Sequence, residues 1–465
     1  MTGEIPKIGE EVGTSPEDVK ASILGATKTE RTLHPRAQQE KMTQDQLDAM
    51  VDLHGRFLSG RLGGRRAILQ NMDISDLSFA GKDMRQADFS GCSMLRMDLS
   101  GTNFQEARVY ACDLSGANLG RCNFIRADLR GSRIEFANLE KANLDKADLR
   151  VGGVARDGGS YNAAQSVNFK GANLSGAKLT GVLAGNADFS DAIMSNVNMM
   201  GADLRDAKME GADLSGAKIG GANLHGAQLK AAILTGVDLS NLKERDADLS
   251  EAITDANIGA SLNDLDEPLA QKIETHRTWV DSAGKEGKQL DLGGYDLRSL
   301  EKLKQERLTA IKAVGARFFG MNLYKIEMQS AILDQTDFRR CDLEEADLRG
   351  SSFRGARFNH ANLKGADFNP LLFGGGEGTK RFSPSDFEGA SLSYADFSET
   401  SLRSANFKGA DLSYANFLGA DLRGADFSDA KLDNTNFDGA DLEEAVMEVP
   451  KGSVFKLESL EEDAE

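Results

Sequence analysis

The sequence of 465 residues has no apolar run near the ~20 residues that a membrane-spanning helix needs. Its N-terminus also lacks the basic and then apolar pattern of a secretory signal. We therefore expect a soluble, cytoplasmic protein. Aromatic residues make up only 6%, whereas 49 residues are glycine, which indicates a thin interior with many turns rather than one thick core.

Cysteine is scarce, with four residues at Cys92, Cys112, Cys122 and Cys341. A disulfide framework or a metal site is one interpretation of them. Each, however, stands two positions before a large apolar residue, where alanine is usual in this sequence. We interpret them as small buried replacements for alanine, in agreement with a reducing compartment. A contact between the thiols of Cys92 and Cys112, which are 20 residues apart, stays open.

Between Asp386 and Met447 a large apolar residue occurs at every fifth position, with phenylalanine and leucine in alternation. Two residues before it stands alanine, serine or threonine, and glycine often stands two residues after it. A period of five fits neither an α-helix, at 3.6 residues, nor a flat strand, at 2. It predicts a chain that turns a corner every five residues and stacks coil on coil. The seven prolines all lie outside such repeats, as expected of a residue that cannot donate to a backbone ladder.

The pattern A(D/N)LxG resembles the pentapeptide-repeat family over roughly two thirds of the chain. The resemblance implies an all-β solenoid, a right-handed quadrilateral parallel β-helix with four pentapeptides per coil. With four sides to a coil, the alternation of phenylalanine and leucine predicts two opposite columns of rings in the core. One column contains Phe387, Phe407 and Phe427, and the other contains Phe397, Phe417 and Phe437. We expect Phe417→Asp to destabilise the fold severely and Asn416→Asp, at an outward position, to have almost no effect.

The repeats form two blocks, and each block follows a segment whose apolar residues have helical spacing. A capping box at residues 43–46 begins the first of these helices. The motif His54-x-x-Phe57 in this helix returns as His276-x-x-Trp279 before the second block. These four residues are expected in helical caps that cover the first coil of each block. We expect each histidine to pack on that coil and to hydrogen-bond there, with a functional pair of histidines as the alternative.

The predicted organisation is two units of one design. Its segments are a disordered N-terminal tail at 1–42, a helical cap at 43–66, the first pentapeptide-repeat β-helix at 67–258 with a loop at 150–166, a helical cap and connector at 259–312, the second β-helix at 313–449 with a loop at 369–385, and an acidic tail at 450–465. A short helix is predicted from Pro16 to about Leu24. Whether 299–312 is helix or irregular coil stays open, as does the question of whether the two blocks are coaxial or hinged.

No pattern in the sequence indicates catalysis. The five histidines are scattered without the spacing of metal ligands. The glycine triplet in the second loop is not followed by the Lys-Ser or Lys-Thr of a phosphate-binding loop. Aspartate and asparagine abound, but at outward positions of the repeat they are expected to be solvated. We therefore expect a protein without enzymatic activity, cofactor or metal.

The loops that interrupt the repeats are the candidates for function. In the second loop Leu371, Leu372 and Phe373 follow one another, which is more apolar than a solvated loop needs. We predict these three residues, and Tyr161 of the first loop, as contacts with a protein partner whose identity the sequence does not give. The hypothesis is a non-enzymatic scaffold that binds a protein through a rigid β-helix and its protruding loops. The open ends of the solenoid also offer a route to oligomerisation.

The alternative function is that of a DNA mimic that binds and inhibits DNA gyrase or another DNA-binding protein, as some members of the family do. The net charge of −18 favours it, but residues 383–465 alone, with 19 acidic and 6 basic residues, carry −13 of that charge. A mimic of duplex DNA should be acidic along its whole rod. The chain has no basic stripe, so we expect no direct binding of nucleic acid, and we expect no insertion into a membrane.

Overall fold

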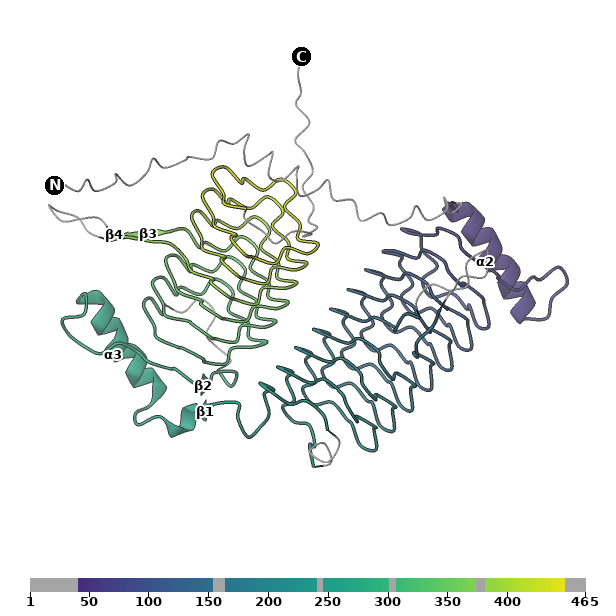
Figure 1. Cartoon of the computed structure of the whole chain (residues 1–465), viewed down its shortest axis with the longest axis horizontal. Coiled ribbons are helices and arrows are strands. Elements are labelled where there is room, and N and C mark those ends of the chain that lie inside the picture. Colours follow the sequence, from purple (N-terminus) through teal and green to yellow (C-terminus); the bar gives the residue numbers. More distant parts are fainter. Residues whose placement is uncertain (1–40, 154–163, 241–245, 301–306, 374–380, 448–465) are drawn as a thin grey trace, which may run out of the picture. The chain divides into compact units, whose positions relative to one another are not determined.

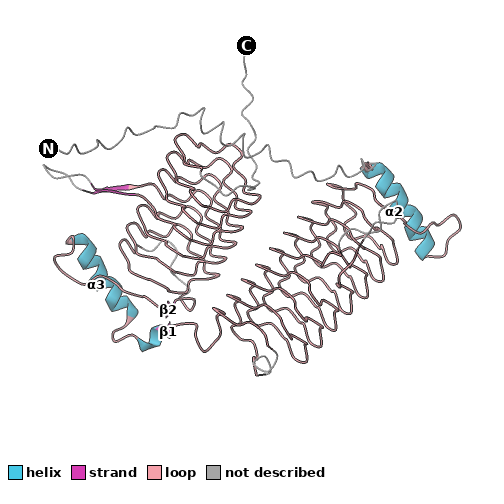
Figure 2. Cartoon of the chain, in the orientation of Figure 1, coloured by secondary structure: helices cyan, strands magenta, loops and turns pink. Residues whose placement is uncertain are grey.

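The computed structural model describes residues 41–153, 164–240, 246–300, 307–373 and 381–447 (Figure 1). Its helices and strands are α2 at Gln44–Leu58, β1 at Ala260–Ser261, the 3-10 helix η1 at Leu262–Asp264, α3 at Leu269–Asp281, β2 at Tyr295–Asp296, β3 at Leu371–Phe373 and β4 at Arg381–Ser383. Most other residues in these ranges alternate between single β-bridges and turns, which Figure 2 draws as loop. No helix in the described ranges is both long and apolar enough to cross a membrane.

Each regular coil contains 20 residues. The residue before a large apolar residue forms a parallel bridge with the residue 20 positions on, as Asn103 does with Asn123. Single hydrogen bonds flank each bridge, such as the bond of 2.7 Å from the backbone N–H of Phe104 to the carbonyl of Asn123. Because a bridge is one residue long and a turn follows it, this β-solenoid has few residues in extended strands. Four pentapeptides therefore close one coil, as the resemblance implied.

The corners between bridges are tight turns. The N–H of Ala107 donates to the carbonyl of Phe104 at 2.9 Å, and Glu106 between them has a φ of 58°. Glu106 is the third residue of the four-residue turn from Phe104 to Ala107. A positive φ at this place is typical of a type II turn, in which glycine is the least strained choice. Glycine does occupy the equivalent place in many repeats, as at Gly101, which explains its abundance in the sequence.

The large and the small residues of the repeats point inward and are buried. In the second block the rings of Phe387 and Phe407 stack with centroids 5.0 Å apart, and those of Phe397 and Phe417 stack at 4.8 Å. Rings of different columns meet edge to face, as Phe397 and Phe407 do with an angle of 88°. The two columns continue with Phe427 and Phe437, respectively. The ten-residue alternation of the sequence thus appears as two columns that face each other in the core.

All four cysteines are free thiols at buried inward positions. The thiols of Cys112 and Cys122 each donate to a main-chain carbonyl of the preceding coil at 2.9 Å. Burial raises the pKa of the Cys92 thiol to about 11 and that of Cys122 to about 12, so both stay protonated at neutral pH. The cysteines therefore fill positions of the size of alanine, and no disulfide joins them.

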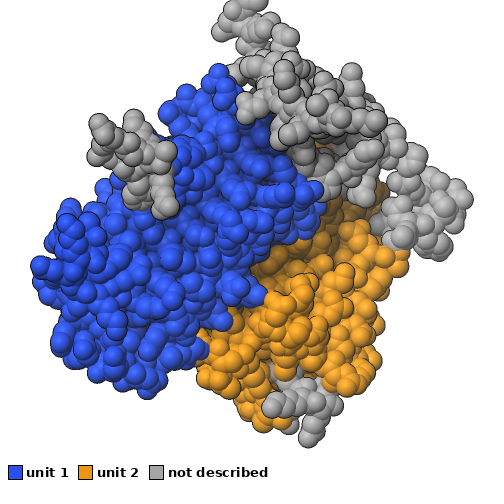
Figure 3. All heavy atoms as spheres, turned by 60° about the vertical axis from the view of Figure 1, so that its left-hand side comes forward, with its two compact units in different colours: residues 1–32, 259–465 blue, residues 33–258 orange. Residues whose placement is uncertain are grey.

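The described residues fall into two compact units that divide in the sequence between Ile258 and Gly259 (Figure 3). The first unit in chain order ends at Ile258 and is orange in Figure 3, where it is labelled unit 2, and the second unit begins at Gly259 and is blue, where it is labelled unit 1. Each unit has a hydrophobic core of its own. In the first unit, α2 contributes the buried side chains of Leu47 and Val51 to that core. In the second unit, the half-buried Ile273 of α3 packs in the same way. Both helices therefore lie with their apolar side against coils of their own unit.

The coils of the second unit begin earlier than the predicted residue 313. Asp291 already bridges Lys312, and the side chains of Leu290 and Leu292 are buried. A glycine pair directly after Leu292 and an irregular frame hid this coil from the repeat pattern. Within the segment 299–312, the residues from Arg307 onward belong to a regular coil of the solenoid, since Arg307 forms a parallel bridge with Glu327. Residues 301–306 lie outside the described ranges.

The first unit also extends beyond its predicted start. Lys41 forms a parallel bridge with Asp73, and the half-buried Met42 packs against the core. The last two residues of the predicted tail at 1–42 thus belong to the solenoid. The helix predicted from Pro16 lies outside the described residues.

Candidate interaction surfaces

The first loop leaves the solenoid through a short antiparallel stem. Gly152 and Gln165 exchange two backbone hydrogen bonds, of 2.9 and 2.7 Å. The stem lies so close to the preceding coil that a Cβ atom on Gly152 would come within 2.8 Å of the backbone nitrogen of Gly131. Glycine at residue 152 is therefore needed for this close approach. Beyond the stem, Tyr161, the predicted partner contact, lies outside the described residues.

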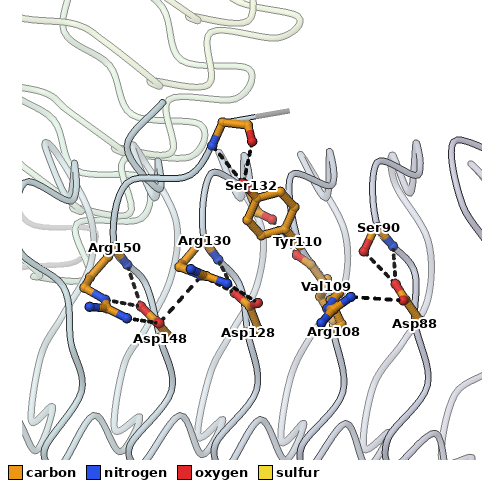
Figure 4. A network of polar contacts seen from close by, with 11 residues as sticks. Asp88, Ser90, Arg108, Val109, Tyr110, Asp128, Arg130, Ser132, Asp148 and Arg150 are labelled. Carbon is orange, nitrogen blue, oxygen red and sulfur yellow. Dashed lines mark hydrogen bonds and ion pairs between the residues drawn. The ribbon is translucent and has the colours of Figure 1, made fainter. Parts of the chain in front are cut away.

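Tyr110 fixes the stem to the side of the solenoid. Its hydroxyl donates to the carbonyl of Gly153 at 2.6 Å and accepts from the N–H of the same residue at 2.9 Å (Figure 4). The guanidinium group of Arg130 lies over the ring of Tyr110, 5.4 Å from its centroid. A single side chain thus satisfies both backbone groups at the point where the loop departs.

Arginine and aspartate form repeated forks along this side of the first unit. In the sequence Asp-Leu-Arg, the arginine donates through Nε and Nη2 to the aspartate two residues earlier, as Arg130 does to Asp128 and Arg150 to Asp148 (Figure 4). Nε of Arg130 also lies 3.6 Å from Asp148, which links one coil to the next. Burial alone would raise the pKa of Asp148, yet hydrogen bonds from Arg150 hold that pKa below its usual value.

A pocket of about 370 Å³ interrupts this row of forks. Its lining residues are Arg130, Arg150, Val151, Gly185, Asn186, Asp203 and Arg205. The bridges run from Asp148 to Leu183 and from Leu183 to Asp203, so the coil that contains Gly185 lies between two coils with complete forks. Gly185 stands where its neighbours have arginine. The sequence did not reveal the pocket, because the intervening loop hides which residues become neighbours.

The second loop forms the antiparallel hairpin of β3 and β4. Leu372 pairs with Phe382, and their side chains are 67% and 54% exposed. Because side chains of directly paired residues lie on one face of a sheet, these two form an exposed apolar pair. The half-buried Leu371 sits at the base, where a Cβ on Gly350 would come within 3.1 Å of it.

The structure therefore separates the predicted triplet of the second loop. Leu372 is exposed, Leu371 packs at the base of the hairpin, and Phe373 pairs through its backbone with Arg381. The side chain of Phe373 lies outside the described part of the structure. Phe382 was missed, although its apolar character beside polar and charged residues was a signal. Only the pairing across the hairpin brings it next to Leu372.

His54 links α2 to the first coil through both of its ring nitrogens. The backbone N–H of Ala67 donates to Nδ1 at 3.0 Å, and Nε2 lies 3.1 Å from the carbonyl of Arg85. Because a backbone N–H can only donate, Nδ1 is the acceptor and Nε2 carries the proton. The imidazole is therefore neutral in this arrangement. Its ring stacks on that of Phe57, with the centroids 5.8 Å apart.

His276 makes the same contacts in the second unit. The N–H of Leu290 donates to Nδ1 at 3.1 Å, Nε2 lies 3.0 Å from the carbonyl of Thr309, and the ring stacks on Trp279 at 5.8 Å. Burial lowers the pKa of both histidines below the ordinary 6.5, against the raising effect of the bonds to the carbonyl groups. The duplication seen in the sequence thus extends to individual hydrogen bonds.

The remaining polar residues offer little chemistry. Among the described residues, no group of three or more His, Cys, Asp or Glu could hold a metal ion. His360 stacks on Tyr394 at 4.7 Å, and Tyr394 stacks on Tyr414 at 5.2 Å, each from a turn with positive φ. This half-buried row of rings was not predicted, because the insertion of the second loop lies between His360 and Tyr394.

Comparison with known proteins identifies the repeats. A family model described as pentapeptide repeats matches residues 67–108, 111–150, 168–206, 207–241 and 331–369, and a model described as a pentapeptide repeat region matches residues 380–462. A search of curated proteins found no match.

Solved structures resemble parts of the chain. Full-length QnrB1, a plasmid-mediated fluoroquinolone resistance protein, is 19% identical over 41% of this chain and 92% of its own, with a TM-score of 0.24. HetL, from the cyanobacterium Nostoc sp. strain PCC 7120, is 19% identical over 71% of this chain and 89% of its own, with a TM-score of 0.16. At these scores neither likeness carries an argument about function. The family models, however, cover more than half of the residues, and the chain belongs to the pentapeptide-repeat family.

Proposed function

We propose that this protein is a non-enzymatic interaction scaffold. In this proposal the scaffold consists of two right-handed quadrilateral β-helices, each preceded by a helical cap. Their loops protrude from the solenoid and bind a protein partner in the cytoplasm. The observation that carries the proposal is the exposed apolar pair of Leu372 and Phe382 on a hairpin seated against Gly350. Leaving two large apolar side chains in water on a protruding element is unfavourable unless something covers them.

The hairpin is suited to present this pair. Its base is held by the close contact of Leu371 with Gly350, so a partner would meet a largely preformed surface and lose little freedom in ordering it. Full burial of a fully exposed side chain of this size contributes about 1.5–3 kcal/mol. Leu372 and Phe382 are 67% and 54% exposed, so covering each of them contributes a part of that amount. A partner with an apolar groove, rather than a charged one, matches this element.

The two helices have a different role in the proposal. Without α2 and α3, the first coil of each unit would expose apolar core and unpaired backbone groups, which invites association between copies. Leu47 and Val51 of α2 cover such core in the first unit. We propose that the helices act as caps, which leaves the loops rather than the solenoid starts as binding elements.

Partner capture from native cells tests the proposal. The double variant Leu372→Ser, Phe382→Ser removes the apolar pair and leaves the solenoid intact. The matched control is Leu418→Ser, because Leu418 is 48% exposed on a regular coil of the same unit. We expect the wild type and the control to retain one specific protein that the double variant loses. An identical set of captured proteins from all three chains would contradict the proposal, provided that their melting temperatures agree.

A DNA mimic is the second candidate, favoured by the acidic excess of residues 383–465. Among the described coils, however, several carboxylates in this segment are already paired. Asp421 bonds both Arg403 and Arg423, and Lys431 bonds Asp411. Inhibition of gyrase supercoiling at micromolar protein would support this candidate, and absence of inhibition would remove it.

A further inference from the structure

The pocket in the first unit is a gap in a row of arginine forks. Asp148, Leu183 and Asp203 are bridged in succession, and the residues two positions later are Arg150, Gly185 and Arg205. The outer two coils thus carry complete Asp-Leu-Arg forks, while the middle coil carries no side chain at the equivalent place. The pocket of about 370 Å³ opens at this place.

The backbone does not require glycine at this place. Gly185 does not have a positive φ, and a Cβ atom there would meet the carbonyl of Arg205 at 3.6 Å, an ordinary van der Waals distance. This contrasts with Gly152, where an added Cβ would collide with backbone. Glycine at residue 185 is therefore not needed for the turn, and its effect is to leave the pocket open.

The walls of the pocket offer hydrogen-bond donors in excess. A guanidinium group has five N–H donors in a planar fork suited to carboxylates. Arg150 and Arg205 each direct Nε and Nη2 to their own aspartate. Within the described ranges, Nη1 of neither arginine has a hydrogen-bond acceptor. The pocket is lined by three arginines, Arg130, Arg150 and Arg205, and by one acidic residue, Asp203.

The occupant follows from the charge balance. Each arginine is already paired with an aspartate, so a free anion is held mainly by the remaining N–H donors and binds only weakly. An acidic side chain on a protein that also touches the nearby loop stem gains more, because it is held at high effective concentration. We propose that this pocket receives an Asp or Glu side chain from an acidic segment of the protein partner. This deepens the proposed scaffold function and rests on it.

The test titrates the full chain with hexaglutamate at low ionic strength and follows the backbone amide resonance of Asn186. We expect millimolar hexaglutamate, but not hexaglutamine, to shift this resonance, and added salt to reverse the shift. Inorganic phosphate is the second probe. A shift with phosphate and none with hexaglutamate overturns the assignment to a carboxylate side chain, as does the absence of a shift with either.

Two variants show whether the pocket itself binds. Gly185→Gln places a side chain inside the pocket and should weaken hexaglutamate binding about tenfold or more, whereas Gly185→Ala, with one added carbon, should bind like the wild type. The matched control is Gly220→Gln, since Gly220 stands at the same place of another repeat and also has room for a Cβ. Equal affinities of Gly185→Gln and the wild type would overturn the proposal. The variant Leu372→Ser, Phe382→Ser should bind the peptide normally, so failure of the hairpin hypothesis is distinguished from failure of this one.

Discussion

The side-chain amide of Asn416 donates a hydrogen bond of 3.0 Å to the carboxylate of Asp396 in the preceding coil. The carbonyl oxygen of Asn416 accepts in turn from the amide of Asn436 at 2.9 Å. The outward positions of this column therefore form a ladder of directed hydrogen bonds from coil to coil. The sequence pattern alone indicated that these side chains are simply solvated, but they also bond to one another.

This ladder changes the expectation for Asn416→Asp. The substitution was expected to have almost no effect, but it removes a donor and places a second carboxylate beside Asp396. We now predict a loss of about 1–3 kcal/mol at pH 7. The loss should shrink as the pH falls towards 4, because protonation of one carboxylate removes the repulsion.

Urea unfolding at both pH values measures this effect. The control is Asn434→Asp, because Asn434 is an exposed turn residue of a nearby coil and has a φ of 57°, which aspartate tolerates. Equal stability of the two variants at pH 7 would show that the ladder contributes nothing.

The inward orientation of the phenylalanine columns predicts a sharp contrast between neighbouring residues. Phe417→Asp places a charge in a stack where Phe397 and Phe437 contact both ring faces, and should cost more than about 4 kcal/mol. Leu418→Asp introduces the same carboxylate at a side chain that is 48% exposed, and should cost less than about 1 kcal/mol. Similar melting temperatures of the two variants would refute the assignment of the faces.

The paired histidines predict a loss of stability in mild acid. Asp83, Arg66 and Arg85 face His54 with opposing effects on its pKa, and burial dominates, so the folded pKa lies below the ordinary 6.5. Protonation is therefore unfavourable in the fold. The contribution of these histidines to the free energy of unfolding is fully present above about pH 6.5. It is lost as the pH falls below that value, by up to about 1.4 kcal/mol per pH unit for each histidine.

Comparison of unfolding at pH 7.5 and pH 5 checks this prediction. In the double variant His54→Gln, His276→Gln the difference between the two pH values should be smaller than in the wild type, although the variant is less stable at pH 7.5. His225→Gln is the control, because His225 is exposed on a regular coil, and it should keep the pH dependence of the wild type. An unchanged pH dependence in the double variant would mean that other groups cause the loss.

Removal of one hydroxyl group should loosen the first loop. Tyr110→Phe abolishes both hydrogen bonds to Gly153, and the local cost is about 1–2 kcal/mol. We expect faster amide hydrogen exchange at Gly152 and Gly153 and faster proteolysis of the loop, without a large change in the melting temperature of the unit. Tyr324→Phe, which removes a hydroxyl bonded to the exposed Glu345, should leave exchange at the loop stem unchanged. Unaltered exchange in Tyr110→Phe would show that the stem is held by other contacts.

The period of five was sufficient to predict the solenoid, because one repeat contains both its turn and its inward residues. The alternation of Phe387 with Leu392 also predicted the ring columns, since four sides and a ten-residue period leave only one arrangement. The match between His54 and His276 predicted where helices meet coils. These features depend on residues close in the sequence or on exact repetition.

Features that depend on distant residues escaped prediction. Which residues flank Gly185 depends on how the loop at 150–166 restores the stacking, and this is not encoded in the local pattern. The apolar pair of Leu372 and Phe382 depends in the same way on the register of a hairpin. The coil at Asp291 was missed because glycines replace the usual residues of the repeat.

Site-specific photocrosslinking in native cells tests the scaffold function most directly. A photoreactive p-benzoylphenylalanine is placed at residue 372, in place of Leu372, and in a second chain at residue 418 as the matched exposed control. The account predicts one discrete protein adduct from residue 372, which excess wild-type chain suppresses, and no such adduct from residue 418. The absence of a discrete adduct from residue 372, or the same adducts from both positions, would contradict the account.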